Sequence, residues 1–162
     1  MVKYKRRRID YFFEIIIILS VLGFVGFRSI KPFFLELTYF NKAERVEASL
    51  VEIRIALEKY YQLTGSYPEL NKEGAANDLA LLDYTDRDGK KISFAEIYGK
   101  NILDFTEKTD SLAESNKVID SNNFNKIDGN GGWIYDFSNQ SGEIHPNLPT
   151  NVYFQNINWS KQ

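Results

Sequence analysis

A single acidic residue, Glu14, lies near the N-terminal end of a long apolar run close to the start of the chain. Residues 15–27 carry no charge, so a helix formed by them would suit the interior of a membrane. A carboxylate costs on the order of 2.5–3.5 kcal/mol at the centre of such a segment and less near its end, and it is best tolerated beside a partner. Glu14 is therefore the first candidate functional residue, and its expected chemistry is pairing with a group that neutralises its charge.

A second set of oxygen-bearing side chains lies in the C-terminal third. Asp128-Gly129-Asn130-Gly131 forms a polar turn, and Asp136 follows it closely. Calcium takes about six to eight oxygen ligands, often from Asp and Asn around a glycine turn. The spacing does not match an EF-hand, and Asn-Gly turns are common for backbone reasons. We predict no cofactor, with calcium as the alternative.

Other chemistries find little support in the sequence. The chain has no cysteine, which excludes disulfides, thiol catalysis and thiolate metal sites. Its one histidine, His145, favours a structural role and rules out a site that needs several histidines. No nucleophilic serine motif or phosphate-binding glycine loop occurs. We therefore expect that the protein is not an enzyme; a surface hydrolase is the rival that only unexpected activity would support.

The apolar run itself predicts a membrane helix. Residues 11–27 would span roughly 25 Å at about 1.5 Å per residue, slightly less than a hydrocarbon core of about 30 Å. Arg28 and Lys31 can extend their charged ends toward water, and the apolar side chains between residues 30 and 35 lengthen the contact. We predict a basic leader over residues 1–9, a transmembrane and assembly helix over 10–35, and an extracytoplasmic domain over 36–162.

Charge is distributed unevenly in a way that sets the predicted topology. Five of the 20 basic residues precede Ile9, which leaves 15 basic against 22 acidic residues, a net charge of −7, in the remainder. A basic head beside an apolar helix stays in the cytoplasm and sends the C-terminus outward. A nucleic-acid module would carry its positive charge on the folded domain, so no nucleic-acid partner is expected.

Two simpler interpretations of this segment compete. A cleaved secretory signal peptide has an apolar region of similar length, but residues 28–31 show no small-x-small cleavage pattern, and Glu14 is unexpected at the entrance. A plain single-pass anchor stays a serious rival.

The N-terminal residues resemble the type IV pilin and type II secretion pseudopilin family. Members of that family begin with Gly, the cleavage point, and Phe-Thr-Leu-Ile-Glu before a long apolar helix. Here Asp10-Tyr11-Phe12-Phe13-Glu14 leads into the apolar run, and Glu14 takes the place of the glutamate at the fifth mature position. Gly23 falls where the family often has a glycine, and Pro32 lies one residue beyond the usual proline.

The resemblance continues beyond the apolar run. Residues 56–68 end in Gly65-Ser66-Tyr67-Pro68, similar to the Gly-x-Tyr-Pro that follows the family's helix, and residues 131–136 with 142–144 resemble a hairpin of minor pilins and pseudopilins. The match covers residues 3–70 well and 131–148 loosely. It implies filament subunits as partners, with the inner membrane, an assembly platform and a prepilin peptidase.

Two positions depart from the family pattern, since Ile9 stands in place of Gly and Asp10 in place of Phe. The peptidase cuts after glycine, and here the cleavage pair would be Ile9 and Asp10. In the family the glutamate pairs with the freed amine of a neighbouring subunit. Without cleavage, Glu14 needs another cation, such as Arg8 of a neighbour, or a proton.

The remaining sequence predicts an α+β fold, with a long N-terminal helix packed on a small C-terminal antiparallel sheet. An apolar stripe at helical spacing predicts a helix from about residue 36 to 63, stopped by Gly65, and Gly23, Gly26 and Pro32 are places where it would kink. Its members are Val46, Leu50, Ile53, Leu57 and Tyr60. Shorter signals predict a turn at 86–89, a helix at 94–98, a surface loop over 106–131 with a strand at 117–119, and strands at 133–137, 143–145 and 151–155.

These observations together predict a structural subunit of a type IV pilus or a type II secretion pseudopilus-like filament. We expect the protein in a bacterial inner membrane before it assembles, either staying there or entering a cell-surface filament. The alternative is a non-polymerising single-pass membrane protein with an extracytoplasmic binding domain. The sequence does not distinguish secretion, competence, adhesion and motility systems, or a major from a minor subunit.

Overall fold

The longest element of the computed structural model is the helix α1, Val2–Thr64. The structure describes the backbone of residues 2–162 and the side chains of residues 11–28 and 30–162. The chain divides into two compact units, residues 1–38 and 39–162, and each is described here by itself. Helical structure continues through Gly23, Gly26 and Pro32, although proline at a helix interior removes one backbone hydrogen bond.

The second half of α1 supplies one wall of the core of unit 2. The predicted stripe is confirmed, because all five of its side chains are buried (Val46, Leu50, Ile53, Leu57 and Tyr60). Val51 and Ile55 lie on another face and are about half exposed, at 54% and 49%. Helical periodicity thus assigns each side chain to the core or to the outside, as the sequence predicts.

Gly65 ends α1 in the predicted place. Its φ of 77° lies in the left-handed region, and its N–H donates to the Tyr61 carbonyl over 2.7 Å. This is the usual way in which a glycine satisfies the last turn of a helix. The chain then reverses through Tyr67, whose ring stacks on that of Tyr61 at 4.6 Å between centroids.

Short elements follow on one side of α1. They are two 3₁₀ turns, η1 (Ala75–Asn77) and η2 (Leu79–Leu82), the hairpin of β1 (Tyr84–Thr85) and β2 (Lys91–Ile92), and the helix α2 (Phe94–Tyr98). The predicted turn and the predicted helix are confirmed. Asp86 organises the turn, since its carboxylate accepts the N–H groups of Asp88 and Lys90.

A three-stranded sheet follows, made of β3 (Val118–Asp120), β4 (Trp133–Tyr135) and β5 (Ile144–Pro146) in that order. The β4–β5 pair is antiparallel as predicted, with Ile134 opposite His145. The β3–β4 pair is parallel, so the sheet is mixed and not purely antiparallel. The physical reason is the long connection between β3 and β4, which returns the chain to the end at which β3 began.

The strand predicted over residues 151–155 is wrong. This segment is a turn, and Asn151, Phe154 and Asn156 have φ values of 60°, 60° and 57°. A strand requires extended backbone. The N–H of Phe154 instead bonds within the segment, to the Asn151 carbonyl at 2.9 Å. A final 3₁₀ turn, η3 (Trp159–Lys161), closes the chain.

The segment predicted as a surface loop, 106–131, is partly buried. Thr106 pairs with Ser115 in an isolated antiparallel bridge, and Leu112 and Asn116 are buried. The Asn116 amide donates to the carbonyl of Ala76 at 3.0 Å, so this loop holds the two sides of the unit together. Polar composition predicted exposure here, but the amide groups are hydrogen-bonded inside the fold.

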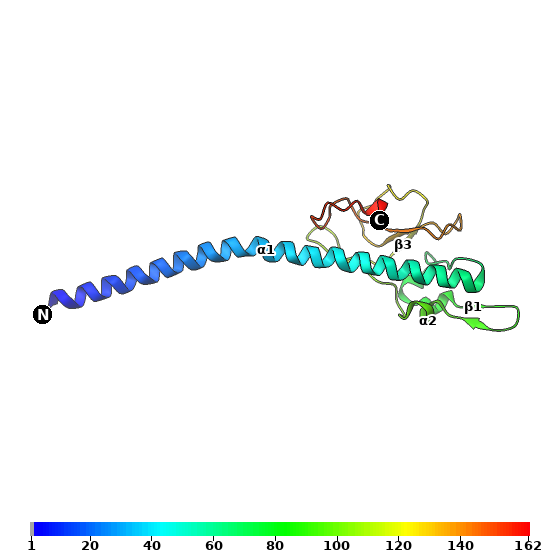
Figure 1. Cartoon of the computed structure of the whole chain (residues 1–162), viewed down its shortest axis with the longest axis horizontal. Coiled ribbons are helices and arrows are strands. Elements are labelled where there is room, and N and C mark those ends of the chain that lie inside the picture. The colour runs from blue at the N-terminus through cyan, green and yellow to red at the C-terminus, as the bar shows by residue number, and fades with distance from the viewer. Residues whose placement is uncertain (1) are drawn as a thin grey trace. The chain divides into compact units, whose positions relative to one another are not determined.

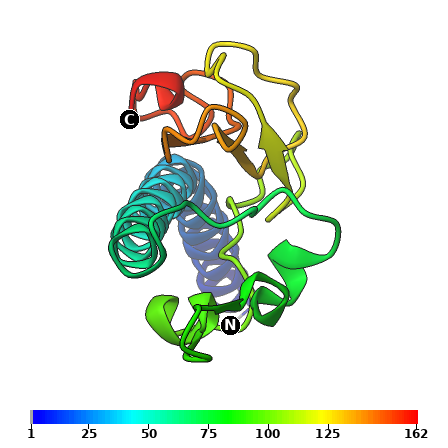
Figure 2. The same cartoon turned by 90° about the vertical axis from the view of Figure 1, so that its right-hand side faces the viewer.

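Unit 2 therefore consists of two lobes on one helix. Figure 1 shows its elements gathered along the cyan-to-green half of α1. In Figure 2, seen along that helix, the green hairpin and α2 lie on one side, and the yellow-to-red sheet and C-terminal segment lie on the other. The largest fully buried side chains come from both lobes and from α1, among them Trp133, Trp159, Phe94 and Ile53. The α+β fold is as predicted.

Gly132, directly before β4, provides a sharp test of this packing. A Cβ there would lie 2.2 Å from the backbone oxygen of Lys117, and its φ is 82°. Gly129 has a similar φ of 77°, with no atom within 4 Å of its Cβ position. We expect Gly132→Ala to lower the free energy of unfolding by about 3 kcal/mol or more, and Gly129→Ala by about 1 kcal/mol.

Urea unfolding followed by the fluorescence of the two buried tryptophans would measure both losses. Because the two glycines share the backbone penalty, the difference between the variants reports the clash with the backbone of Lys117. Equal losses would show that the close approach of Gly132 to Lys117 does not hold.

Candidate membrane and assembly segment

The apolar half of α1 has no cover from the rest of the described chain. Its large apolar side chains between Tyr11 and Leu37 are exposed, from 42% at Ile16 to 71% at Phe27. The helix is long and apolar enough to cross a membrane, and none of its most apolar window is buried. A helix that is apolar on every face requires apolar surroundings, which are either lipid or other helices.

Two aliphatic hydroxyl groups, those of Ser20 and Thr38, are satisfied within the helix. Ser20 donates to the Ile16 carbonyl at 2.8 Å, and Thr38 donates to the Phe34 carbonyl at 2.8 Å. Such bonds to the preceding turn let a hydroxyl enter an apolar medium at little cost. The polar atoms of these two side chains therefore need no partner outside the chain.

Glu14 differs from these hydroxyls. Its side chain is exposed, and within the described part of the chain no group lies within hydrogen-bond or ion-pair distance of its carboxylate. Unlike Ser20, a carboxylate cannot donate to a preceding carbonyl unless it is protonated. The structure thus leaves Glu14 as the one acid of the apolar run, with its charge uncompensated by described residues.

The predicted cleavage pair is not tested by the structure. The backbone of Ile9 and Asp10 belongs to α1, but their side chains lie outside the described residues. Cleavage between them stays a prediction, as does the division of the chain at residues 9 and 35.

In unit 2, the residues considered for calcium belong to separate networks. The Asp128 carboxylate accepts the Asn147 amide at 2.5 Å and the Asn130 N–H at 2.9 Å. Asp136 accepts Asn139 and Ser141, at 2.8 and 2.7 Å. Among the described residues, no group of three or more His, Cys, Asp or Glu side chains could hold a metal ion. Asp136 therefore stabilises its own loop, and Asp128 joins its loop to Asn147, which directly follows β5.

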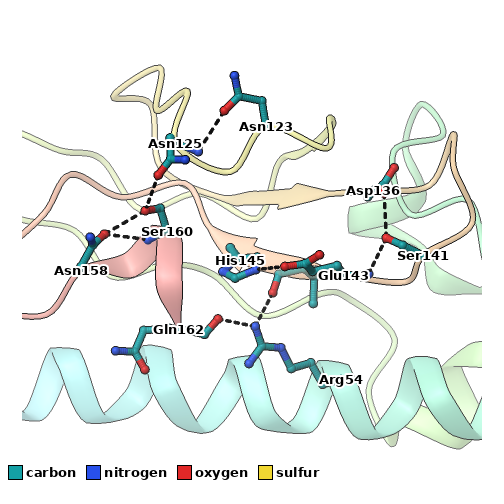
Figure 3. A network of polar contacts seen from close by, with 11 residues as sticks. Arg54, Asn123, Asn125, Asp136, Ser141, Glu143, His145, Asn158, Ser160 and Gln162 are labelled. Atoms are coloured by element: carbon teal, nitrogen blue, oxygen red, sulfur yellow. Dashed lines mark hydrogen bonds and ion pairs between the residues drawn. The ribbon is translucent and has the colours of Figure 1, made fainter.

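His145 is placed as a core residue. It lies on β5, is 6% exposed, and has its ring 4.3 Å from that of Phe124. Its Nε2 is 2.9 Å from Glu143, a contact drawn in Figure 3. A ring packed in this way is a structural residue, in agreement with the sequence interpretation.

Arg54 is the side chain whose role sequence reasoning missed. It lies on the same helix as the apolar stripe but is not part of that stripe. Figure 3 shows its guanidinium between α1 and β5, where it donates to the Ile144 carbonyl at 2.7 Å and to the Gln162 carbonyl at 2.5 Å. Arg54 thereby ties the sheet and the C-terminus to α1. No sequence pattern signals this role, because the acceptors are backbone carbonyls.

A charged groove runs beside α1 on another face. Lys100 bridges Glu52 and Asp104 at 2.6 Å each, and Arg45 contacts Glu107 at 2.5 Å. Each cation there faces an acid, so the groove presents paired charges that join α1 to the segment after α2.

Asp120 gives unit 2 a predicted sensitivity to acid. Burial disfavours its charge, but hydrogen bonds from the Ser138 hydroxyl and from the N–H groups of Ser138 and Phe137 outweigh burial and lower the pKa of its carboxyl. A carboxyl whose folded pKa is depressed stabilises the fold above its unfolded pKa, and this contribution is lost as the pH falls through the folded value.

We therefore expect the free energy of unfolding to decrease below about pH 4, and Ser138→Ala to raise the pKa of Asp120 and reduce its share of that decrease. Titration of the Asp120 carboxyl by NMR is the direct measurement. Ser141→Ala, which removes the hydroxyl that serves Asp136, is the matched control. An Asp120 titration that is the same in both variants would contradict the assignment.

Comparison of the chain with family models, with curated proteins and with solved structures gives no match.

Proposed function

We propose that the protein is a structural subunit of a type IV pilus or a type II secretion pseudopilus-like filament, held in the membrane by its N-terminal helix before assembly. The observation that carries the proposal is an apolar helix half that the described chain leaves uncovered, continuous with a second half that is built into a folded unit. The resemblance of residues 3–70 to pilins and pseudopilins supports the same assignment.

The uncovered segment requires an apolar partner in every state of the protein. Before assembly that partner is lipid, which solvates the side chains between Tyr11 and Leu37. In a filament it is the same segment of neighbouring subunits, packed into a common core. Both environments satisfy the helix, because its backbone groups bond internally and the hydroxyls of Ser20 and Thr38 bond to the preceding turn.

Glu14 would determine the register, that is, the axial alignment of neighbouring helices, which apolar packing alone does not determine. Apolar helices slide past one another at little cost, whereas an unpaired carboxylate in apolar surroundings is costly. Only alignments that bring a cation or a proton to Glu14 avoid that cost. The cation is either the amine freed by cleavage or a basic residue of the leader in a neighbouring subunit.

The folded unit would form the outer surface of such a filament. It is attached to α1 by the buried stripe and by Arg54, so its lobes stay fixed to the helix that assembles. The role is structural and needs no catalytic group.

A second candidate is favoured by one residue, Ile9, which stands where the family has glycine. An uncut chain would remain a single-pass membrane protein with an extracytoplasmic binding domain and would not polymerise.

The register role is tested by Glu14→Leu. We expect this variant to insert in the membrane as before and to lose subunit association by roughly tenfold or more, the change that about 1.4 kcal/mol produces. The chain has no cysteine, so a single Leu22→Cys replacement reports association by disulfide cross-linking in membranes. Glu36→Leu removes an exposed carboxylate later in the same helix and is the matched control.

Cross-linking that is equally strong with and without Glu14 would count against the filament assignment. Loss of cross-linking in the Glu36 variant as well would mean that the effect is not specific to residue 14.

The two candidates also differ in the mature N-terminus. Mass spectrometry of the protein from its native host should give a chain that begins at Asp10 if it follows the pilin route. A chain that begins at Met1 or Val2 would instead support the single-pass anchor.

A further inference from the structure

In the turn after β5, the aromatic side chain of Phe154 is exposed to solvent, and its backbone has a positive φ. We define the Asn151 loop as residues 151–157. Phe154 in this loop has a φ of 60° and is 64% exposed. A bulky side chain rarely adopts the left-handed backbone conformation. Because the Phe154 ring is exposed, no hydrophobic burial offsets the cost of this conformation. A conformational outlier of this kind is a reason to look for a function.

The Asn151 loop is closed by its own hydrogen bonds. The Asn151 N–H donates to the Ile157 carbonyl at 2.9 Å, and the Asn151 side chain accepts the Asn156 N–H at 2.6 Å. Tyr153 anchors the loop in the core, since its ring lies 5.7 Å from that of Trp159 and its hydroxyl donates to the Glu107 carbonyl at 2.6 Å. The fold therefore determines that Tyr153 is buried and Phe154 is exposed.

The groups beside Phe154 are aromatic and basic. Its ring meets the Tyr39 ring edge-on at 5.0 Å between centroids. The Lys42 ammonium lies 5.2 Å from the centre of the Tyr39 ring and donates to the Lys108 carbonyl at 2.7 Å. Lys108 is exposed. Tyr39 itself is buried, with 5% of its surface exposed. We call the other three residues, Lys42, Lys108 and Phe154, the Phe154 surface.

We propose that the Phe154 surface contacts the headgroup region of the phospholipid bilayer in which the N-terminal helix is anchored. Aromatic rings and lysines are the side chains typical of membrane–water interfaces, where the ring enters the acyl boundary and the ammonium meets lipid phosphate. Tyr39 is also the first residue of unit 2 and follows the exposed apolar segment that ends at Leu37. Along the chain, Tyr39, whose ring contacts Phe154, thus lies two residues after the last apolar residue of that segment.

The proposal rests on the membrane anchorage of the proposed function and does not depend on filament formation. Contact with lipid accounts for the strained backbone of Phe154, because an aromatic side chain that enters the headgroup region must remain exposed in the folded domain. A second copy of the chain is the competing occupant.

The test uses the full-length chain in vesicles of phosphatidylcholine and phosphatidylglycerol. Since the chain has no cysteine, three single replacements each carry one fluorescent label: Leu22→Cys in the apolar segment, Gln155→Cys beside Phe154, and Tyr84→Cys in β1 as the remote control. Spin-labelled phospholipid quenches a fluorophore that lies at the bilayer. We expect quenching at positions 22 and 155 and little at 84.

Replacement of Phe154 separates the aromatic contact from simple proximity. Phe154→Gly should remove most of the quenching at position 155 and leave that at 22 unchanged, since glycine adopts this backbone without strain. Phe154→Trp should retain the quenching at 155, because it keeps the aromatic group. Retention of the full quenching in the glycine variant would overturn the role of Phe154.

Three other results would overturn the proposal. If the label at 155 is quenched as weakly as the label at 84, while the label at 22 is strongly quenched, the helix is anchored in the membrane but the Phe154 surface does not contact lipid. A label at 155 that responds to protein density and not to lipid assigns the surface to a second copy. Weak quenching at 22 overturns the membrane anchorage itself, and the lipid contact with it.

Discussion

The burial of one face of α1 is the interaction on which the rest of unit 2 depends. Val46, Ile53 and Leu57 are almost fully buried, and both lobes of the unit pack against the helix that carries them. The lobes themselves contain only short strands and short helices, which would not be stable alone. A single helical face therefore supplies the common surface on which these small elements gain enough apolar contact to fold.

The same constraint has a consequence for the first half of α1. The described apolar side chains of unit 2 that face the core are used within that unit, so they are not available to cover residues 11–37. One continuous helix thus carries two kinds of apolar surface, one satisfied inside the chain and one satisfied only outside it. Membrane anchorage and filament assembly are the two proposed ways in which this second surface is covered.

The charged groups show the same difference between the two halves of α1. Arg54 and Lys100 use their charges to tie segments of unit 2 to α1, through backbone carbonyls in one case and acids in the other. The Asp136 carboxylate of the polar loop 136–141 is satisfied by bonds within that loop, whereas loop 128–131 is bound to Asn147, which follows β5. Glu14 stands apart from these residues, because its carboxylate meets no described partner, and its role therefore has to be sought outside the chain.

Local pattern was enough to predict the long helix, its buried stripe, its stop at Gly65, the turn at 86–89, the helix α2 and the β4–β5 pair. These features follow from side-chain periodicity and from backbone preferences of single residues, which neighbours along the chain determine. Glu14 was chosen as a candidate for the same reason, since a lone charge in an apolar run is visible in the sequence without tertiary information. Tertiary structure alone decided the parallel β3–β4 pair, the left-handed turn in place of a strand at 151–155, the buried part of loop 106–131 and the role of Arg54. Each of these depends on which distant backbone groups come within hydrogen-bond distance, and that is a property of the folded chain.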